Sequence, residues 1–297
     1  MLVTALGAVC LAGRRIVDKR PAVPGIEAEL TVSSPTDSQI SPLIPPNAKH
    51  LTASIFSGAG TGLSIELRRA VTLVGSRPGC KITLRHGDIS PVHCAIINMG
   101  EEVYLRDLMS KKGTYLNGLR AECEKLSHGD VIAVGEWEIA VDVQAPKLGD
   151  PTGSSAINLE PAPSMVALKK NQDGPLVKLR REVNLISRKS GADFVLHDSR
   201  VSRAHALIFI LNGRPVVCDL LSENGLLLNG QATHFGVIHS GDTLTLGSSE
   251  VRVVIPSPTV SAAPSKNGSA ALAETTVKGD NDASDLIDIR AAEVHRD

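Results

Sequence analysis

The chain repeats itself at a fixed offset of 112 residues, and no gap is needed to keep the register. His93 and His205 form one matched pair. The others are Leu73 and Leu185, Gly79 and Gly191, Leu84 and Leu196, Ser90 and Ser202, Asp107 and Asp219, Leu108 and Leu220, Ser110 and Ser222, Gly113 and Gly225, Leu116 and Leu228, Asn117 and Asn229, Gly118 and Gly230, Gly129 and Gly241, Asp130 and Asp242, and Gly135 and Gly247. A register this long indicates two copies of one domain.

Each copy predicts an all-β fold. Short apolar runs such as 63–67, 71–74 and 94–97 alternate with turn residues at a spacing of about 8–12 residues, which is typical of a β-sandwich or barrel. Asn-Gly dipeptides at 117–118 and 229–230 favour tight hairpins, because both residues tolerate positive φ. Neither copy contains an amphipathic pattern of three helical turns. We therefore expect two tandem β-sandwiches.

Composition shifts mark the boundaries. Ser and Pro gather at 31–50, Pro and Gly gather at 146–164, and the apolar periodicity stops after Pro256. The expected organisation is a flexible leader and linker at 1–50, a first domain at 51–145, a linker at 146–163, a second domain at 164–256 and a disordered tail at 257–297.

Composition also excludes several classes of function. The five cysteines form no Cys-x-x-Cys pair, which indicates reduced thiols and predicts neither a metal site nor a cofactor. A net charge of -1 and only 2% aromatic residues argue against nucleic acid as a partner.

The N-terminus has the wrong order for a secretory signal. The apolar run Met1–Gly13 precedes Arg14 and Arg15 instead of following them, and it is too short to span a bilayer. A lipoprotein site at Cys10 is the alternative, although Val9 is a poor residue before a cleavage point. We expect a cytoplasmic protein with a non-structural leader and no membrane partner.

Both copies resemble the forkhead-associated (FHA) domain. That family shows Gly-Arg at a strand end, then Ser-Arg-x-His, Asp-Leu-x-Ser-x-Asn-Gly-Thr, an Asn-Gly turn and a late Gly-Asp. The first copy supplies Gly75, Ser90, His93, Asp107, Leu108, Ser110, Gly113, Thr114, Asn117, Gly118, Gly129, Asp130 and Gly135. The second supplies Arg188, Ser202, Arg203, His205, Asp219, Leu220, Ser222, Asn224, Gly225, Asn229, Gly230, Gly241, Asp242 and Gly247. The resemblance implies sandwiches whose loops at one end bind phosphothreonine.

The second copy matches the motif better. The resemblance implies that Arg188 grips phosphate, that Ser202 and Arg203 act as ligand and supporting cation, and that Asn224 holds the peptide main chain. The residue types suit a phosphate of nearly two negative charges, which an Arg fork can meet with two hydrogen bonds. In departures from the family, Ser187 replaces Gly, Leu226 replaces Thr, and Glu223 places a carboxylate in the loop.

The first copy departs further. Ser76 stands at the arginine position with Arg77 beside it, Pro91 replaces the second Arg, and Lys112 replaces Asn. Ser90 and Lys111 remain as candidate phosphate contacts, together with Arg77 and Lys112. Two readings stay open: a weaker phosphate binder, or a scaffold and dimer surface that would make a homodimer.

The remaining motif residues are predicted to be structural: His93, His205, Asp107, Asp219, Asn117 and Asn229. Ser90, His93 and Asp107 superficially spell a hydrolase triad, but no nucleophile elbow or oxyanion-hole motif accompanies them. We therefore expect no enzyme activity and no catalytic residue.

The sequence favours a phosphothreonine-reading adaptor, with phosphothreonine-containing proteins and a Ser/Thr protein kinase as partners. One rival is a structural interaction scaffold that does not depend on phosphate, and a weaker rival uses the basic loops on nucleic acid. A further hypothesis places a kinase site at Thr275 or Thr276, which follow Glu274 in the tail. Their phosphorylation would fold the tail onto the second copy.

Overall fold

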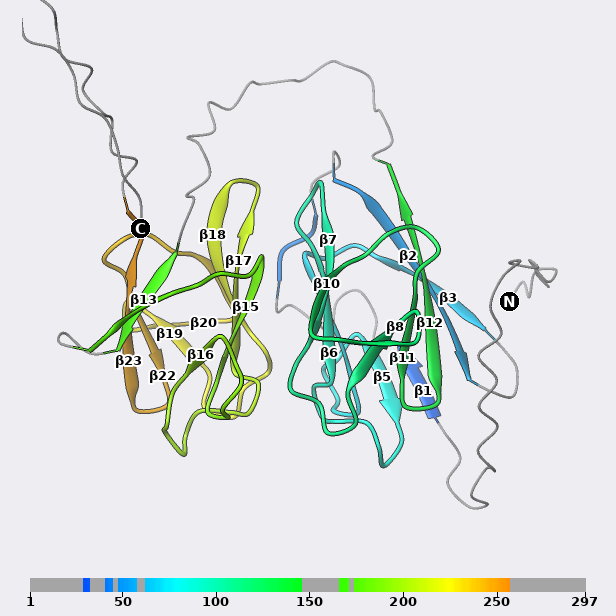
Figure 1. Cartoon of the computed structure of the whole chain (residues 1–297), viewed down its shortest axis with the longest axis horizontal. Helices are drawn as coiled ribbons and strands as arrows, with labels where there is room; N and C mark the ends of the chain where they lie inside the picture. Colours follow the sequence, from blue (N-terminus) through cyan, green and yellow to red (C-terminus); the bar gives the residue numbers. More distant parts are fainter. Residues whose placement is uncertain are drawn as a thin grey trace, which may run out of the picture. The chain divides into compact units, whose positions relative to one another are not determined.

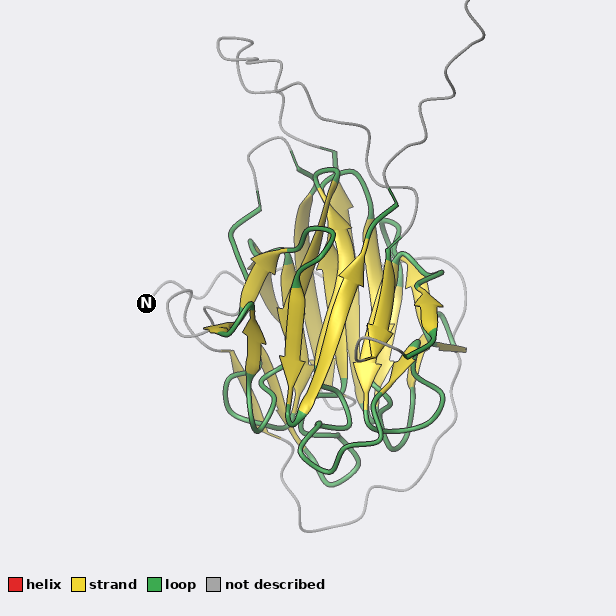
Figure 2. Cartoon of the chain, turned by 90° about the vertical axis from the view of Figure 1, so that its left-hand side faces the viewer, coloured by secondary structure: helices red, strands yellow, loops and turns green. Residues whose placement is uncertain are grey.

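The computed structural model describes residues 29–32, 41–44, 48–57, 62–145, 166–170 and 174–256. Every regular element in these ranges is a β-strand, and Figure 2 shows strands and loops only. The predicted all-β class is confirmed. Within the described ranges there is no helix that is long and apolar enough to cross a membrane.

The first copy forms two six-stranded sheets, and Figure 1 labels most of their strands. One has the order β1-β5-β4-β6-β7-β10 and the other β3-β2-β12-β11-β8-β9. The strands are β1 (Glu29–Val32), β2 (His50–Ser57), β3 (Leu63–Leu67), β4 (Val71–Gly75), β5 (Ile82–Arg85), β6 (Cys94–Asn98), β7 (Val103–Asp107), β8 (Thr114–Leu116), β9 (Leu119–Ala121), β10 (Cys123–Lys125), β11 (Val131–Val134) and β12 (Trp137–Gln144).

The second copy repeats this plan with the sheet orders β14-β13-β23-β22-β19-β20 and β16-β15-β17-β18-β21. The strands are β13 (Ala167–Lys170), β14 (Leu176–Lys178), β15 (Val183–Ser187), β16 (Phe194–Val195), β17 (Ala206–Leu211), β18 (Arg214–Asp219), β19 (Leu226–Leu228), β20 (Gln231–Thr233), β21 (Phe235–Val237), β22 (Thr243–Leu246) and β23 (Ser249–Val254). The match extends to strand direction, since β4 pairs parallel with β5 and β15 pairs parallel with β16.

Period-two alternation builds the sandwich cores. Along β12, Trp137, Ile139 and Val141 are buried while Glu138 is exposed, as expected for a strand with one face on the core. These side chains join one apolar cluster with Ile55, and the equivalent strands of the second copy form a separate cluster.

The leader differs from expectation at one point. Glu29–Val32, inside the predicted flexible segment 1–50, forms β1 and pairs antiparallel with β5. A segment of four residues is too short to show strand periodicity in the sequence, so this strand is recognised only by its pairing with β5. The linker 146–163 lies outside the described residues, as does the tail with Thr275 and Thr276, and the domain limits stay predictions.

Candidate recognition loops

Three loops of each copy meet at one end of one sheet. β4 pairs antiparallel with β6, and β6 pairs antiparallel with β7, so the end of β4, the start of β6 and the end of β7 share an edge. In the second copy β15, β17 and β18 have the same arrangement. All the predicted phosphate and peptide contacts lie on these loops, at 76–93 and 108–113 in the first copy and at 188–205 and 220–225 in the second.

In the second copy, Arg188 follows β15 directly. Its amide donates to the Ser202 carbonyl at 3.2 Å, and its guanidinium Nη1 donates to the Ser199 carbonyl at 3.2 Å on an exposed surface. The Ser202 Oγ accepts the Glu223 amide at 3.1 Å. Because this oxygen acts as an acceptor, its hydroxyl proton remains to donate to a phosphate oxygen.

Asn224 makes a second link between the 220–225 and 188–205 loops, since its Nδ2 donates to the Arg200 carbonyl at 2.7 Å. Arg203 exposes its side chain, while its carbonyl accepts the buried hydroxyl of Ser187. Sequence reasoning treated Ser187 only as a departure from glycine. In the structure Ser187 ties the end of β15 to the backbone of Arg203. The only sign of this role in the sequence is a serine at the end of an apolar strand.

A buried histidine joins the loops in each copy. Nδ1 of His205 accepts the Ser202 amide at 3.0 Å, so Nε2 carries the proton and donates to the Gly225 carbonyl at 3.0 Å. His93 makes the equivalent bonds to Ser90 and Gly113, each at 3.1 Å. Burial lowers the pKa of both rings, which keeps them neutral.

An aspartate shapes the turn after β7 and after β18. Asp219 accepts the Ser222 amide at 3.2 Å together with the Ser222 hydroxyl, and Asp107 does the same for Ser110. Asp107 also accepts the Thr114 hydroxyl at 2.7 Å, a bond that Leu226 cannot supply in the second copy.

The Asn-Gly dipeptides form the hairpin turns at β8–β9 and β19–β20. Asn117 and Asn229 each have φ of 51°, in the left-handed region. The Asn117 side chain donates to Asp130 at 2.8 Å and accepts the Val131 amide at 3.0 Å. Asn229 makes the same pair of bonds with Asp242 and the Thr243 amide, each at 2.9 Å.

The first copy keeps the hydrogen bonds between its recognition loops, but its cationic side chains are arranged differently from those of the second copy. The Ser90 Oγ accepts the Lys111 amide at 3.0 Å, and Lys111 is exposed. Lys112 lies 3.5 Å from the Asp88 carboxylate. Arg77 does not join these residues, because its Nη1 donates to the carbonyl of Leu221, in the second copy, at 2.7 Å.

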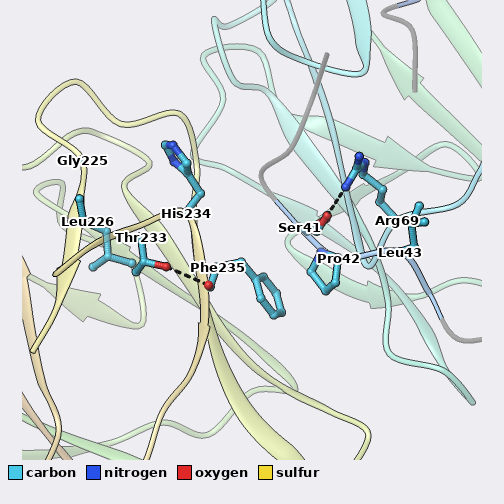
Figure 3. Close-up of a pocket in the computed structure, with 10 residues that line it drawn as sticks. Ser41, Pro42, Leu43, Arg69, Gly225, Leu226, Thr233, His234 and Phe235 are labelled. Carbon is cyan, nitrogen blue, oxygen red and sulfur yellow. Dashed lines mark hydrogen bonds between the residues drawn. The ribbon is translucent and has the colours of Figure 1, made fainter. Parts of the chain in front are cut away.

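A pocket lies beside the recognition loops of the second copy and is lined in part by Gly225, at the end of the 220–225 loop. Figure 3 shows its lining, in which Ser41, Pro42 and Arg69 of the first copy face Thr233, His234 and Phe235 of the second. It includes none of the predicted phosphate contacts. The described residues also contain no group of three or more His, Cys, Asp or Glu side chains placed to hold a metal ion.

Both copies are β-sandwiches that present three hydrogen-bonded loops at one edge of a sheet. Comparison with known proteins identifies the family to which these domains belong. The FHA domain model matches residues 72–135 and 185–247. The chain belongs to the FHA family and carries two tandem FHA domains.

Each of the following relatives matches part of the chain. The glycogen accumulation regulator GarA of Mycobacterium tuberculosis is 27% identical over 131 residues, which are 43% of this chain and 79% of that protein. A structure from a study of phosphothreonine-dependent FHA domain interactions is 32% identical and covers 32% of this chain and 99% of its own, with a TM-score of 0.30. The FhaA FHA domain, solved with the intracellular domain of another protein, is 34% identical and covers 30% of this chain and 98% of its own, with a TM-score of 0.28.

Proposed function

We propose that this chain is a phosphothreonine-reading adaptor in Ser/Thr-kinase signalling and that its second FHA domain is the main reader. FHA domains are phosphopeptide-binding modules and not catalytic ones. The partners would be phosphothreonine-containing proteins and the kinase that modifies them. The similarity to GarA, which is named a regulator, agrees with a signalling role.

One observation carries the proposal: the exposed Arg188 lies on the same hydrogen-bonded loop frame as the Ser202 hydroxyl. Arg188 bonds the backbone of residues 199 and 202, and Ser202 bonds the loop at Glu223, so the two donors are held on adjacent loops before any ligand arrives. Each charge-assisted hydrogen bond to a phosphate contributes about 1.5–3 kcal/mol. Two or three such bonds are enough to make binding depend on phosphorylation.

The first domain supports a different reading for itself. Ser76 directs its hydroxyl to the Ile89 carbonyl at 3.1 Å, and Arg77 bonds the second domain. The two remaining lysines offer point charges without the geometry of an arginine fork. For this domain the phosphate-independent scaffold is the second candidate.

The test is titration of the full chain with a phosphothreonine peptide library, beside the phosphoserine and unphosphorylated peptides. We expect binding that requires phosphothreonine and falls by at least about tenfold in Arg188→Ala, which removes a charged donor. Arg214→Ala is the matched control, because Arg214 is an exposed arginine at the opposite end of β18. Equal binding of phosphorylated and unphosphorylated peptides would leave the scaffold as the function.

A further inference from the structure

The central strands of one sheet in each domain are buried on both faces. All five residues of β4 and of β6 are buried, and so are all five of β15. A strand buried on both faces needs a cover on each side. The sandwich core covers one face, so a second layer must cover the other.

The second layer is the other domain. One apolar cluster contains Val71, Leu73, Ala95, Ile97, Tyr104 and Leu108 of the first domain and Val183, Leu185, Leu207, Phe209, Val216 and Leu220 of the second. Each residue of the first group lies 112 positions before its counterpart in the second. The two domains therefore use the same surface, as the subunits of a two-fold dimer do.

Reciprocal contacts at the recognition loops support this symmetry. A Cβ placed on Gly79 would lie 3.2 Å from Cδ1 of Leu221. A Cβ placed on Gly191, the counterpart of Gly79, would lie 3.5 Å from Cε of Met109, the counterpart of Leu221. The loop after β4 thus lies against the loop after β18, and the loop after β15 lies against the loop after β7.

Polar contacts break the symmetry in favour of the second domain. Arg77 donates to the Leu221 carbonyl at 2.7 Å. Leu221 and its counterpart Met109 both have positive φ, of 56° and 57°, so the two turns share a conformation and differ in the donor that they receive. The equivalent of Arg77 is Lys189, whose side chain makes no hydrogen bond within the described ranges. Among the described residues, the Leu221 turn of the second domain receives an arginine from the first domain, and the Met109 turn of the first domain receives none from the second.

That turn leads directly into the proposed reading loop. Ser222 follows Leu221 and bonds Asp219, and then the Glu223 amide bonds Ser202. A shift of the Leu221 carbonyl would move the Glu223 amide and, through it, the Ser202 hydroxyl.

We propose that the first domain completes the reader: Arg77 is a positioning residue that holds the 220–225 loop of the second domain in its binding conformation. This inference rests on the proposed function of the second domain. Arg77, which the sequence analysis placed among the phosphate contacts, would then act through the second domain and not by touching phosphate itself.

The experiment uses the full chain and a phosphothreonine peptide selected by the wild type. Arg77→Ala and Arg77→Lys are compared with Lys125→Ala, a control that removes an exposed cation of the first domain outside its recognition loops. Peptide affinity is measured by calorimetry, and the backbone amide signals of Ser222, Glu223 and Asn224 are recorded by NMR without peptide. A charge-assisted hydrogen bond corresponds to about tenfold or more in an equilibrium constant.

We expect Arg77→Ala to weaken peptide binding by about three- to tenfold and to shift the three amide signals in the free protein, with partial recovery in Arg77→Lys and neither effect in Lys125→Ala. Loss of affinity with unchanged amide signals would make Arg77 a direct ligand and overturn the proposal. Unchanged affinity in a chain that does bind the peptide would also overturn it. If the wild type binds no phosphopeptide, the proposed function fails, while the amide signals still decide whether Arg77 positions the loop.

Discussion

The ion pair between Arg106 and Asp193 gives the sharpest test of the contact between the two domains. Arg106 Nη2 lies 2.5 Å from Asp193 Oδ2, and the two side chains are 5% and 13% exposed. The same oxygen accepts the Leu185 amide at 2.8 Å, while Oδ1 lies 3.1 Å from Nε of Arg181. Asp193 is therefore the centre of a small polar network inside an apolar interface.

Asp193→Ala would leave the Arg106 guanidinium buried with one remaining bond, from Nη1 to the Glu122 carbonyl at 3.3 Å. Removing one partner of a buried pair costs about 3–5 kcal/mol. For a folded unit of this size, that loss corresponds to a fall of roughly 6–20 °C in melting temperature. Arg106→Met should cost less, because Asp193 keeps Arg181 and the Leu185 amide.

Calorimetric melting of the full chain measures this loss. Lys125→Ala is the control, because Lys125 forms an exposed pair with Glu102 whose removal should cost only about 0.2–1 kcal/mol. If Asp193→Ala melts within about 1 °C of the wild type, the pair is not buried in solution and the interface argument fails.

Three further outcomes follow from local geometry. Asn229→Ala should cost about 1–3 kcal/mol, because it removes two hydrogen bonds and places alanine at positive φ, whereas Asn229→Gly should recover part of that loss in chemical denaturation. Burial holds the pKa of His93 and His205 below the ordinary 6.5, so below that pH the unfolded chain binds more protons than the folded chain. The contribution of the two neutral rings to stability is therefore complete above about pH 6.5 and is lost as the pH falls below it. Melting temperatures at pH 7.5 and pH 5.5 measure this loss. Burial raises the pKa of the Cys94 and Cys218 thiols far above neutrality, so iodoacetamide should modify them only in the unfolded chain, and rapid native labelling seen by mass spectrometry would contradict this.

The sequence predicts the sandwiches well because repetition and alternation are local patterns. The offset between His93 and His205 and the Asn-Gly turns required no tertiary information. The family that the motif residues resemble is confirmed. The domain contact was harder to predict. Apolar residues on the outer face of β4 and β6 look the same in sequence as residues of a single core, and only the sheet assignment separates the two faces.

The direction of Arg77 could not be read from the sequence for the same reason. Its position beside Ser76 suggested a phosphate contact, whereas its hydrogen-bond partner lies 144 positions away. Ser187 shows the reverse case: a residue that looked like a defect in the motif holds the Arg203 carbonyl. Both roles depend on which loops meet in space.

The Arg106–Asp193 pair also decides which surfaces can associate. The counterpart of Asp193 in the first domain is Lys81, and the counterpart of Arg106 in the second is Cys218. Two first domains joined through this sheet would bring Arg106 against Lys81, while two second domains would leave Asp193 against a thiol. Each domain therefore fits its neighbour in the chain better than it fits its own duplicate. Fusion in one polypeptide lets a mismatched pair of sequences keep a two-fold arrangement.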